Sequence, residues 1–346
     1  MSDRGTRKRA LIVPIFIPNE GCPYRCIYCH QVKITSQPTQ PVDESTIKQT
    51  LHNAINATGF DASREPEVAF YGGTFTRLPV GRMKELLEAA APFLREGWFK
   101  SIRVSTRPDS LQEEPLRLMR KLGVATVELG TQSMDDAVLK LSRRGHTSRD
   151  TIDSVHLLKT HGFKVGIQLM PGLPGDSEEI FLKTVGEVIK LRPDMVRLYP
   201  TLVIKGTELA RWYMENRYHP LSLDAAIRIC QESCARLEQK GIPVIRIGMM
   251  SSPALLLRDE IMAGPWHSAF GFLVRSGIHQ DKIASCLHAQ GVAGQIKLRV
   301  PSAEIPLVRG YKNRGLRLIE EKTGARVVDT IGDDAVPSGQ VEVDVL

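Results

Sequence analysis

Residues 10–30 read ALIVPIFIPNEGCPYRCIYCH and combine two signals. The first part, ALIVPIFI at 10–17, is a short apolar run with several β-branched residues, which predicts a buried strand. The second part places Cys22, Cys26 and Cys29 within eight residues. The first structural prediction is therefore a strand that leads directly into a cysteine-rich loop.

Apolar runs of the same kind return six times along the chain. They are EVAFY (67–71), SIRVS (101–105), VATVELG (124–130), KVGIQLM (164–170), MVRLYP (195–200) and PVIRIG (243–248). Between them, helical periodicity appears at 43–58, 80–95, 110–122, 148–162, 177–191 and 222–240. Apolar strands separated by helices predict an α/β fold with a parallel sheet covered on both faces. Their number favours a complete or partial β/α barrel, with an open doubly wound sheet as the alternative.

The pattern changes after residue 250. Segment 251–294 is mixed in character, contains a Gly-Pro-Trp-His turn at 264–267, and is interpreted as a connecting segment. Residues 295–346 predict a small α+β unit. Its elements are strand QIKLRV (295–300), helix RGLRLIEEK (314–322) and strands ARVVDT (325–330) and QVEVDV (340–345). We therefore divide the chain into a core at 1–250, a connector at 251–294 and a C-terminal unit at 295–346.

Composition is that of an ordinary globular protein. The 346 residues are 42% hydrophobic and 25% charged, and no run of about eighteen apolar residues suggests a membrane span. The basic start MSDRGTRKRA is followed by a short, proline-containing apolar run that is a poor signal peptide. We expect a cytoplasmic protein without a membrane partner. A net charge of +7 and a pI near 9.1 permit a polyanionic partner such as RNA.

Three thiols in one short loop of a cytosolic chain indicate metal binding rather than disulfides. A cubane with four irons normally takes four protein thiolates, so three would leave one iron open to a substrate or cofactor. The alternative is structural zinc, which needs four ligands, usually in two separated pairs. His30 could complete the set but directly follows Cys29, and no second Cys-x-x-Cys pair lies downstream.

The loop resembles the signature of the radical S-adenosylmethionine (SAM) superfamily, Cys-x-x-x-Cys-x-aromatic-Cys, with Tyr28 as the aromatic residue. The resemblance implies a partial (β/α) barrel of the radical SAM type and a 4Fe-4S cluster on Cys22, Cys26 and Cys29. It also implies that SAM binds the open iron and is cleaved to a 5′-deoxyadenosyl radical. An electron donor such as ferredoxin or flavodoxin would then be a partner.

Polar residues at the ends of the predicted strands are the candidate SAM contacts, because barrel enzymes build their sites there. They are Tyr28, Gly72, Gly73, Thr74, Thr106, Arg107, Gln132, Ser133 and Gln168. Thr74 stands where the superfamily usually has a glutamate. The alternative for the stretch at 105–109 is that Asp109 or Ser110 caps the next helix, and both interpretations can hold because Asp109 and Arg107 have different roles. His146 is either a site residue or a charge partner of a helix end, and Cys230 and Cys234 are interpreted as core thiols.

Three short motifs narrow the resemblance further. Gly130-x-Gln-Ser, Arg144-Gly-His and the stretch at 199–207 are similar to the radical SAM domain of the Elongator catalytic subunit family, over roughly residues 10–250. Members of that family act on wobble uridines in tRNA with the help of an acetyltransferase domain. We find no counterpart of that second domain in the sequence, so the expectation covers only the radical half and a tRNA base as substrate.

The C-terminal unit resembles a KH domain, in which a Gly-x-x-Gly loop opens a helix and contacts nucleic-acid backbone. The loop is degenerate here, because Asn313 stands in place of the second glycine. Basic residues from Lys297 to Arg326 outnumber the nearby acids Glu304, Glu320 and Glu321, which predicts a basic unit suited to RNA. The alternative for this unit is a small helix-on-sheet cap with a solvated charged face. For the whole protein, the alternative functions are radical chemistry on a small molecule such as a porphyrin precursor and an RNA-binding module with a structural metal.

Overall fold

A computed structural model describes residues 11–35, 41–249, 260–292 and 294–346. Seven parallel strands form one sheet in the order β1-β2-β3-β4-β5-β6-β8. They are β1 (Ile12–Phe16), β2 (Glu67–Tyr71), β3 (Ser101–Thr106), β4 (Val124–Gln132), β5 (Lys164–Leu169), β6 (Met195–Leu198) and β8 (Val244–Ile247). No pairing joins β1 to β8 within the described residues, so the sheet curls into a partial barrel. All seven predicted strands are confirmed.

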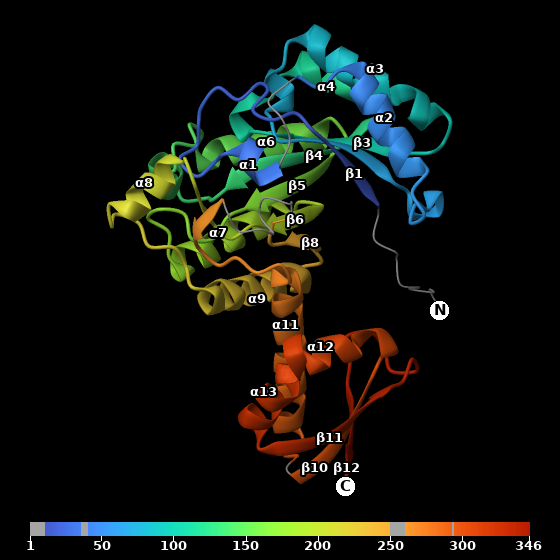
Figure 1. Ribbon diagram of the computed structural model, residues 1–346, viewed down its shortest axis with the longest axis vertical. Helices are drawn as coiled ribbons and strands as arrows, with labels where there is room; N and C mark the ends of the chain where they lie inside the picture. Colours follow the sequence, from blue (N-terminus) through green and yellow to red (C-terminus); the bar gives the residue numbers. More distant parts are fainter. Residues whose placement is uncertain (1–10, 36–40, 250–259, 293) are drawn as a thin grey trace.

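Helices follow the strands and cover the outer face of the sheet (Figure 1). The six predicted helices are confirmed as α2 (Glu44–Ile55), α3 (Val80–Arg95), α4 (Glu113–Lys121), α6 (Ser148–Thr160), α7 (Glu178–Leu191) and α9 (Leu223–Gln239). Shorter helices are α1 (Gln31–Thr35), α5 (Asp136–Leu141) and α8 (Glu208–Met214). Side-chain caps begin several of them; Thr147 and Asp150 form a capping box at α6.

The main core lies between the outer face of the sheet and these helices. Fully buried side chains such as Phe70, Leu86 and Val165 belong to one contiguous apolar cluster. Cys230 and Cys234 lie in the same cluster, which agrees with their interpretation as core thiols. Because the apolar residues are turned outward to the helices, the inner face of the barrel is left for polar side chains.

The C-terminal unit contains a three-stranded sheet of order β11-β10-β12. Its elements are β10 (Gly294–Val300), α12 (Ile305–Arg309), α13 (Arg314–Thr323), β11 (Ala325–Gly332) and β12 (Glu342–Val345). Along the chain these elements follow the order β10-α12-α13-β11-β12. Lys312 and Asn313 both adopt positive φ, 54° and 59°, in the loop between the two helices.

The expected connector is largely one long helix, α11 (Phe270–Ala289). Figure 1 shows it running from beside α9 into the C-terminal unit. A two-stranded ribbon of β7 (Val203–Ile204) and β9 (Ile261–Ala263) precedes it along the chain. The predicted boundary at 250/251 lies outside the described residues, and the start of the first predicted strand, residue 10, does as well. The three-part division therefore stays a prediction.

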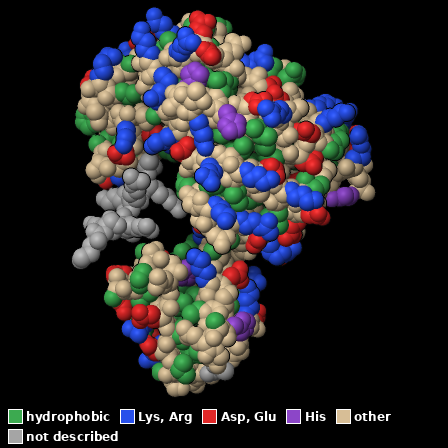
Figure 2. Space-filling view, turned by 180° about the vertical axis from the view of Figure 1, so that it is seen from behind, with side chains coloured by type: hydrophobic (Ala, Val, Ile, Leu, Met, Phe, Trp, Pro, Cys, Tyr) green, Lys and Arg blue, Asp and Glu red, His purple; other side chains and the backbone are tan. Residues whose placement is uncertain are grey.

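The expectation of a basic C-terminal unit is wrong for the unit as a whole. Residues 295–346 contain eight Lys or Arg and eight Asp or Glu. The charges are segregated instead: 309–326 holds six basic and two acidic residues, whereas 327–346 holds five acidic and no basic ones. In Figure 2, Asp and Glu side chains gather along one edge of the unit. The excess of basic residues is therefore confined to segment 309–326, which runs from the end of α12 through α13 into β11.

Across the parts of the chain described above, no helix combines the length and apolar character that a membrane span requires.

Candidate active site

Backbone contacts fix the cysteine loop against the turn that follows β2. The Thr74 N–H donates to the Glu20 carbonyl oxygen at 2.8 Å. A Cβ on Gly73 would overlap that same oxygen and lie 2.9 Å from the carbonyl oxygen of Ile17. At its other end, the loop is tied to α8, because the Leu209 N–H donates to the Ile27 carbonyl oxygen at 2.8 Å. The Gly-Gly turn and the loop thus form one packed unit.

The three thiols of this loop are half-buried and near one another. Burial, followed by the charges of Cys26 and Cys22, raises the pKa of Cys29 to about 12. No three His, Cys, Asp or Glu side chains among the described residues are placed to hold a single metal ion. In a cubane each thiolate binds a different iron, so the thiols need not converge, and the donor set fits such a cluster.

Buried polar groups surround the thiols. The Thr74 hydroxyl lies 3.4 Å from the Cys22 sulfur, and Arg144 donates to the Cys26 sulfur at 3.0 Å. The hydroxyl of Tyr28 is buried and has no hydrogen-bond partner within the described residues. Burial raises the pKa of Tyr28 well above its usual value. The loop therefore presents its sulfur ligands beside polar side chains.

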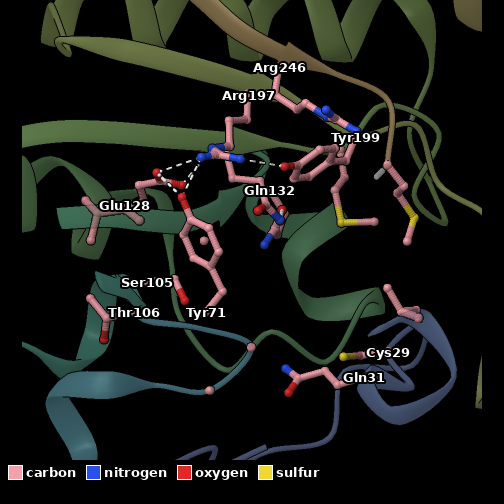
Figure 3. Close-up of a pocket in the computed structure, with 18 of the residues that line it drawn as sticks. Cys29, Gln31, Tyr71, Ser105, Thr106, Glu128, Gln132, Arg197, Tyr199 and Arg246 are labelled. Atoms are coloured by element: carbon pink, nitrogen blue, oxygen red, sulfur yellow. Dashed lines mark hydrogen bonds and ion pairs between the residues drawn. The ribbon is translucent and has the colours of Figure 1, made fainter. Parts of the chain in front are cut away.

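A cavity of about 1690 Å³ occupies the inside of the barrel. The three cysteines line it together with most predicted SAM contacts, namely Tyr28, Gly72, Gly73, Thr74, Thr106, Arg107, Gln132 and Gln168. In Figure 3, Gln132 on a strand and Cys29 on the loop border the same space. Thr106 lies beside Thr76, with 2.5 Å between their hydroxyl oxygens. The structure thus brings residues from five separate segments to one cavity.

Gln132 is held in an unusual backbone conformation at the end of β4. Its φ is 70°, and the pairing of β4 with β5 is irregular between Leu129 and Gln132. The Gln168 amide donates to the Gln132 side-chain oxygen at 3.1 Å. Because positive φ costs a non-glycine residue free energy and bulges redirect side chains, this geometry supports a functional role for Gln132.

Two predicted residues have different surroundings from those expected. Ser133 does not line the cavity; its hydroxyl lies 3.3 Å from that of Thr184 and accepts from the Asp135 N–H at 3.1 Å. Arg107 makes two hydrogen bonds of 2.9 Å to Asp109, so these two residues share one ion pair. The next α-helix, α4, begins after Gln112 without a side-chain cap, so the prediction that Asp109 or Ser110 caps it is wrong. The cause is local, because the chain turns at Pro108 and brings the two side chains together.

His146 is a buried residue rather than a charge partner at a helix end. One ring nitrogen lies 3.2 Å from the Thr131 carbonyl oxygen, and the other has no partner within the described residues. Burial, with the neighbouring charges of Arg144 and Arg107, lowers the pKa of His146 to about 3. The imidazole is therefore neutral at physiological pH.

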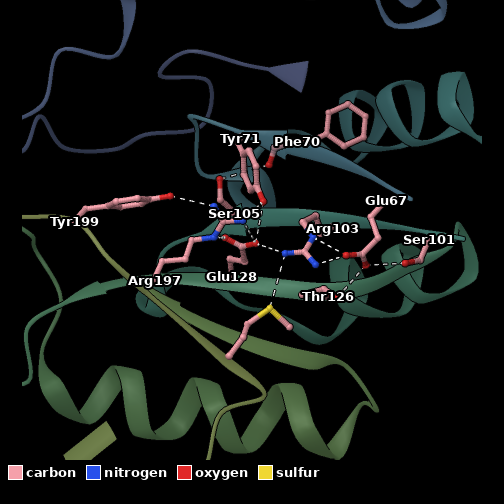
Figure 4. Close-up of polar contacts among 11 residues, drawn as sticks. Glu67, Phe70, Tyr71, Ser101, Arg103, Ser105, Thr126, Glu128, Arg197 and Tyr199 are labelled. Carbon is pink, nitrogen blue, oxygen red and sulfur yellow. Dashed lines mark hydrogen bonds and ion pairs between the residues drawn. The ribbon is translucent and has the colours of Figure 1, made fainter. Parts of the chain in front are cut away.

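An ionic network crosses the inner face of the barrel (Figure 4). Glu128 accepts hydrogen bonds from Tyr71 at 2.9 Å and from Arg103 at 2.6 Å, and its other oxygen lies 2.7 Å from Arg197. Arg103 also donates to Glu67 at 2.9 Å, and Arg197 donates to the Tyr199 hydroxyl at 3.0 Å. Two carboxylates and two guanidinium groups balance each other in this buried array.

None of these network residues was among the sequence-predicted site residues. The available signal was a single charged residue inside each apolar run, Arg103 in SIRVS, Glu128 in VATVELG and Arg197 in MVRLYP. Charges in otherwise apolar strands must face a polar cavity or pair with each other. Here they do both, and the network gives the cavity its charged wall.

Comparison with known families agrees with this fold and site. Residues 16–188, half of the chain, match the Radical SAM superfamily, and residues 193–280 match the Radical SAM C-terminal domain. The chain belongs to the radical SAM superfamily. It is thus an enzyme of the class that binds a 4Fe-4S cluster and SAM.

Within this superfamily, the chain is similar in sequence to two proteins of the same name. The sequence is 43% identical over 129 residues, 36% of the chain, to tRNA uridine(34) acetyltransferase of Methanocaldococcus infernus. It is 32% identical over 232 residues, 58% of the chain, to the protein of that name from Dehalococcoides mccartyi. These matches span 24% and 50% of the two relatives, so the chain covers at most half of either one.

Among solved structures, the fold resembles archaeal Elp3 of Methanocaldococcus infernus, determined with an N-terminal deletion. The TM-score is 0.61 at 24% identity, covering 82% of this chain and 69% of that one. The predicted likeness to the Elongator catalytic subunit family is confirmed.

Proposed function

We propose that this enzyme binds a 4Fe-4S cluster through Cys22, Cys26 and Cys29, cleaves SAM, and modifies a uridine in tRNA. The observation that carries the proposal is the packing of the three-thiol loop against the Gly72-Gly73 turn at the barrel cavity. When bound, the cluster and SAM together supply a 5′-deoxyadenosyl radical that abstracts a hydrogen atom from the substrate.

The chain's own residues would bind and orient SAM. Gly73 and Thr74 lie beside the cluster loop, and Thr106, Gln132 and Gln168 supply hydrogen-bonding groups along the cavity wall. The charge of Arg107 is neutralised by Asp109, so this residue would shape the cavity wall rather than offer SAM a free positive charge. Ser133, turned away to Thr184, would support the strand end instead of touching the cofactor.

The names of the relatives support tRNA uridine as the substrate class. A basic surface is available on α12, α13 and the loop between them, where Arg309, Lys312, Arg314 and Arg317 are exposed. Tyr311, 40% exposed, adds an aromatic ring that could stack on a base. The same loop contacts the connecting segment, since the ring of Tyr311 lies 4.9 Å from that of His267, which precedes α11. A low-potential donor such as ferredoxin or flavodoxin would deliver the electron in the cytoplasm.

Anaerobic reconstitution tests the first half of the proposal. The wild-type chain should take up about four irons and four sulfides, and with dithionite and SAM it should release 5′-deoxyadenosine. Cys26→Ser should abolish both. Cys286→Ser should retain both, because this thiol lies outside the loop and accepts a hydrogen bond from the Gln290 amide. Zinc in place of iron, or a cluster that yields no 5′-deoxyadenosine, would contradict the proposal.

Nucleoside analysis tests the second half. Bulk tRNA digests from cells with and without the gene should differ in one uridine derivative, which wild-type protein restores and Cys26→Ser protein does not. Unchanged tRNA nucleosides, together with active SAM cleavage, would contradict tRNA as the substrate and favour a small molecule instead.

A further inference from the structure

Arg144 differs from the other buried arginines of the described chain. Its exposed fraction is 6%, close to the 4% of Arg103 and 5% of Arg107. Arg103 is paired with Glu67 and Glu128, and Arg107 with Asp109. Arg144 has no carboxylate within 4.0 Å among the described residues. A buried cation without a counter-ion is costly by several kcal/mol, so Arg144 needs a negative partner other than a carboxylate.

The position of Arg144 identifies that partner. One terminal nitrogen donates to the Cys26 sulfur at 3.0 Å, and the other donates to the carbonyl oxygen of Gly130. A Cβ at residue 130 would lie 3.2 Å from that second nitrogen, so the glycine leaves the guanidinium room to approach. The end of β4 therefore fixes the guanidinium group of Arg144 through one terminal nitrogen, and the other terminal nitrogen points at a thiol of the proposed cluster.

We propose that Arg144 is the charge partner of the cluster and raises its reduction potential. The inference rests on the proposed cluster at Cys22, Cys26 and Cys29. Three thiolates give a [4Fe-4S]2+ cluster a net charge of about −1, and one-electron reduction makes it about −2. A neighbouring cation stabilises the more negative state, and hydrogen bonds to sulfur act in the same direction. Arg144 thus makes the cluster easier to reduce while holding Cys26 in place.

Redox titration of the reconstituted enzyme, followed by the EPR signal of the reduced cluster, tests this role. Arg144→Met should make one-electron reduction at least tenfold less favourable, a shift of about 59 mV to more negative potential. Arg144→Lys keeps the positive charge but loses the planar guanidinium group with its two donating nitrogens. Its cluster should therefore have a reduction potential between those of the Met variant and the wild type. The matched control is Arg143→Gln, which removes the same charge from the next residue. Its side chain is 60% exposed and paired with Glu208, so its potential should equal that of wild type.

The outcomes are distinct. A loaded Met variant with the wild-type potential would overturn the role of Arg144 and leave the proposed function intact. If the Met variant does not take up a cluster, the Lys variant decides, and an unshifted potential there would overturn the inference. Equal shifts in the Arg143 and Arg144 variants would also overturn it, because the effect would then be one of net charge. Failure of the wild-type chain to form a cluster would instead contradict the proposed function.

Discussion

Gly73 and Glu20 are in backbone contact, with no room between them for a Cβ on the glycine. The Glu20 carbonyl oxygen accepts the Thr74 N–H, and this hydrogen bond ties the cysteine loop to the end of β2. The two residues are 53 positions apart in the sequence, and the pairing of β1 with β2 brings them together. The conformation of the cluster loop therefore depends on a glycine outside it.

Gly73→Ala should disturb the loop without touching a cysteine. The added methyl group must push the loop away, and such overpacking costs typically about 1–3 kcal/mol. We expect a lower thermal midpoint and clearly reduced iron content after reconstitution. The control is Gly81→Ala in α3, where a Cβ meets nothing within 4 Å. Normal iron content in Gly73→Ala would show that the loop tolerates the shift.

The internal network should matter more for stability than the surface ion pairs. Glu128→Gln removes the carboxylate that serves Arg103 and Arg197, and an unpaired buried charge typically costs about 3–5 kcal/mol. The measurement is the free energy of urea unfolding. Glu113→Gln breaks an exposed pair with Arg117, at 62% and 74% exposure, and should cost less than about 1 kcal/mol. Equal losses in the two variants would rule out a structural role for the network.

The parts of this fold that sequence predicts are the parts determined locally. Each strand is an apolar run and each of the six helices has its own apolar stripe, so neighbouring residues carry the information. Helix α11 was missed because its buried side includes Ser276, His279 and Gln280, which breaks the apolar periodicity.

The site divides in the same way. The cysteine loop and the Gly-Gly turn are contiguous motifs and could be found from sequence. The ion pair of Arg107 with Asp109, and the approach of Arg144 to Cys26, depend on how separate segments meet. Their residue types alone did not distinguish a cofactor contact from an internal partner.

His146 should make the protein less stable in mild acid. Its pKa is lowered to about 3 by burial and by Arg144 and Arg107, against about 6.5 in an unfolded chain. The unfolded state therefore binds a proton that the folded state does not, and stability falls as the pH drops from 6.5 towards 3. At pH 5 this contribution is about 2 kcal/mol relative to pH 7.

His146→Gln removes that titration and should flatten the decline of unfolding free energy between pH 7 and pH 5. The exposed His219→Gln should follow the wild-type curve. The explanation fails if both variants decline as steeply as wild type.

The basic helix α13 should contact RNA phosphates. Arg314 and Arg317 are exposed on it, within segment 309–326, where basic residues exceed acidic ones. Each phosphate contact contributes roughly 0.7–0.9 to the slope of log affinity against log salt concentration. The double variant Arg314→Gln, Arg317→Gln should therefore bind tRNA more weakly and lower that slope by roughly 1.4–1.8 in filter-binding titrations.

The control must lose the same net charge elsewhere. Arg117→Gln with Arg149→Gln does so on α4 and α6, where the two side chains are 74% and 76% exposed on the outside of the barrel. This control should keep the wild-type affinity and slope, because counterion release depends on direct contacts rather than on total charge. If both double variants weaken binding equally, tRNA is attracted by the overall charge of the protein. A wild-type slope in the α13 variant would place the RNA on another surface.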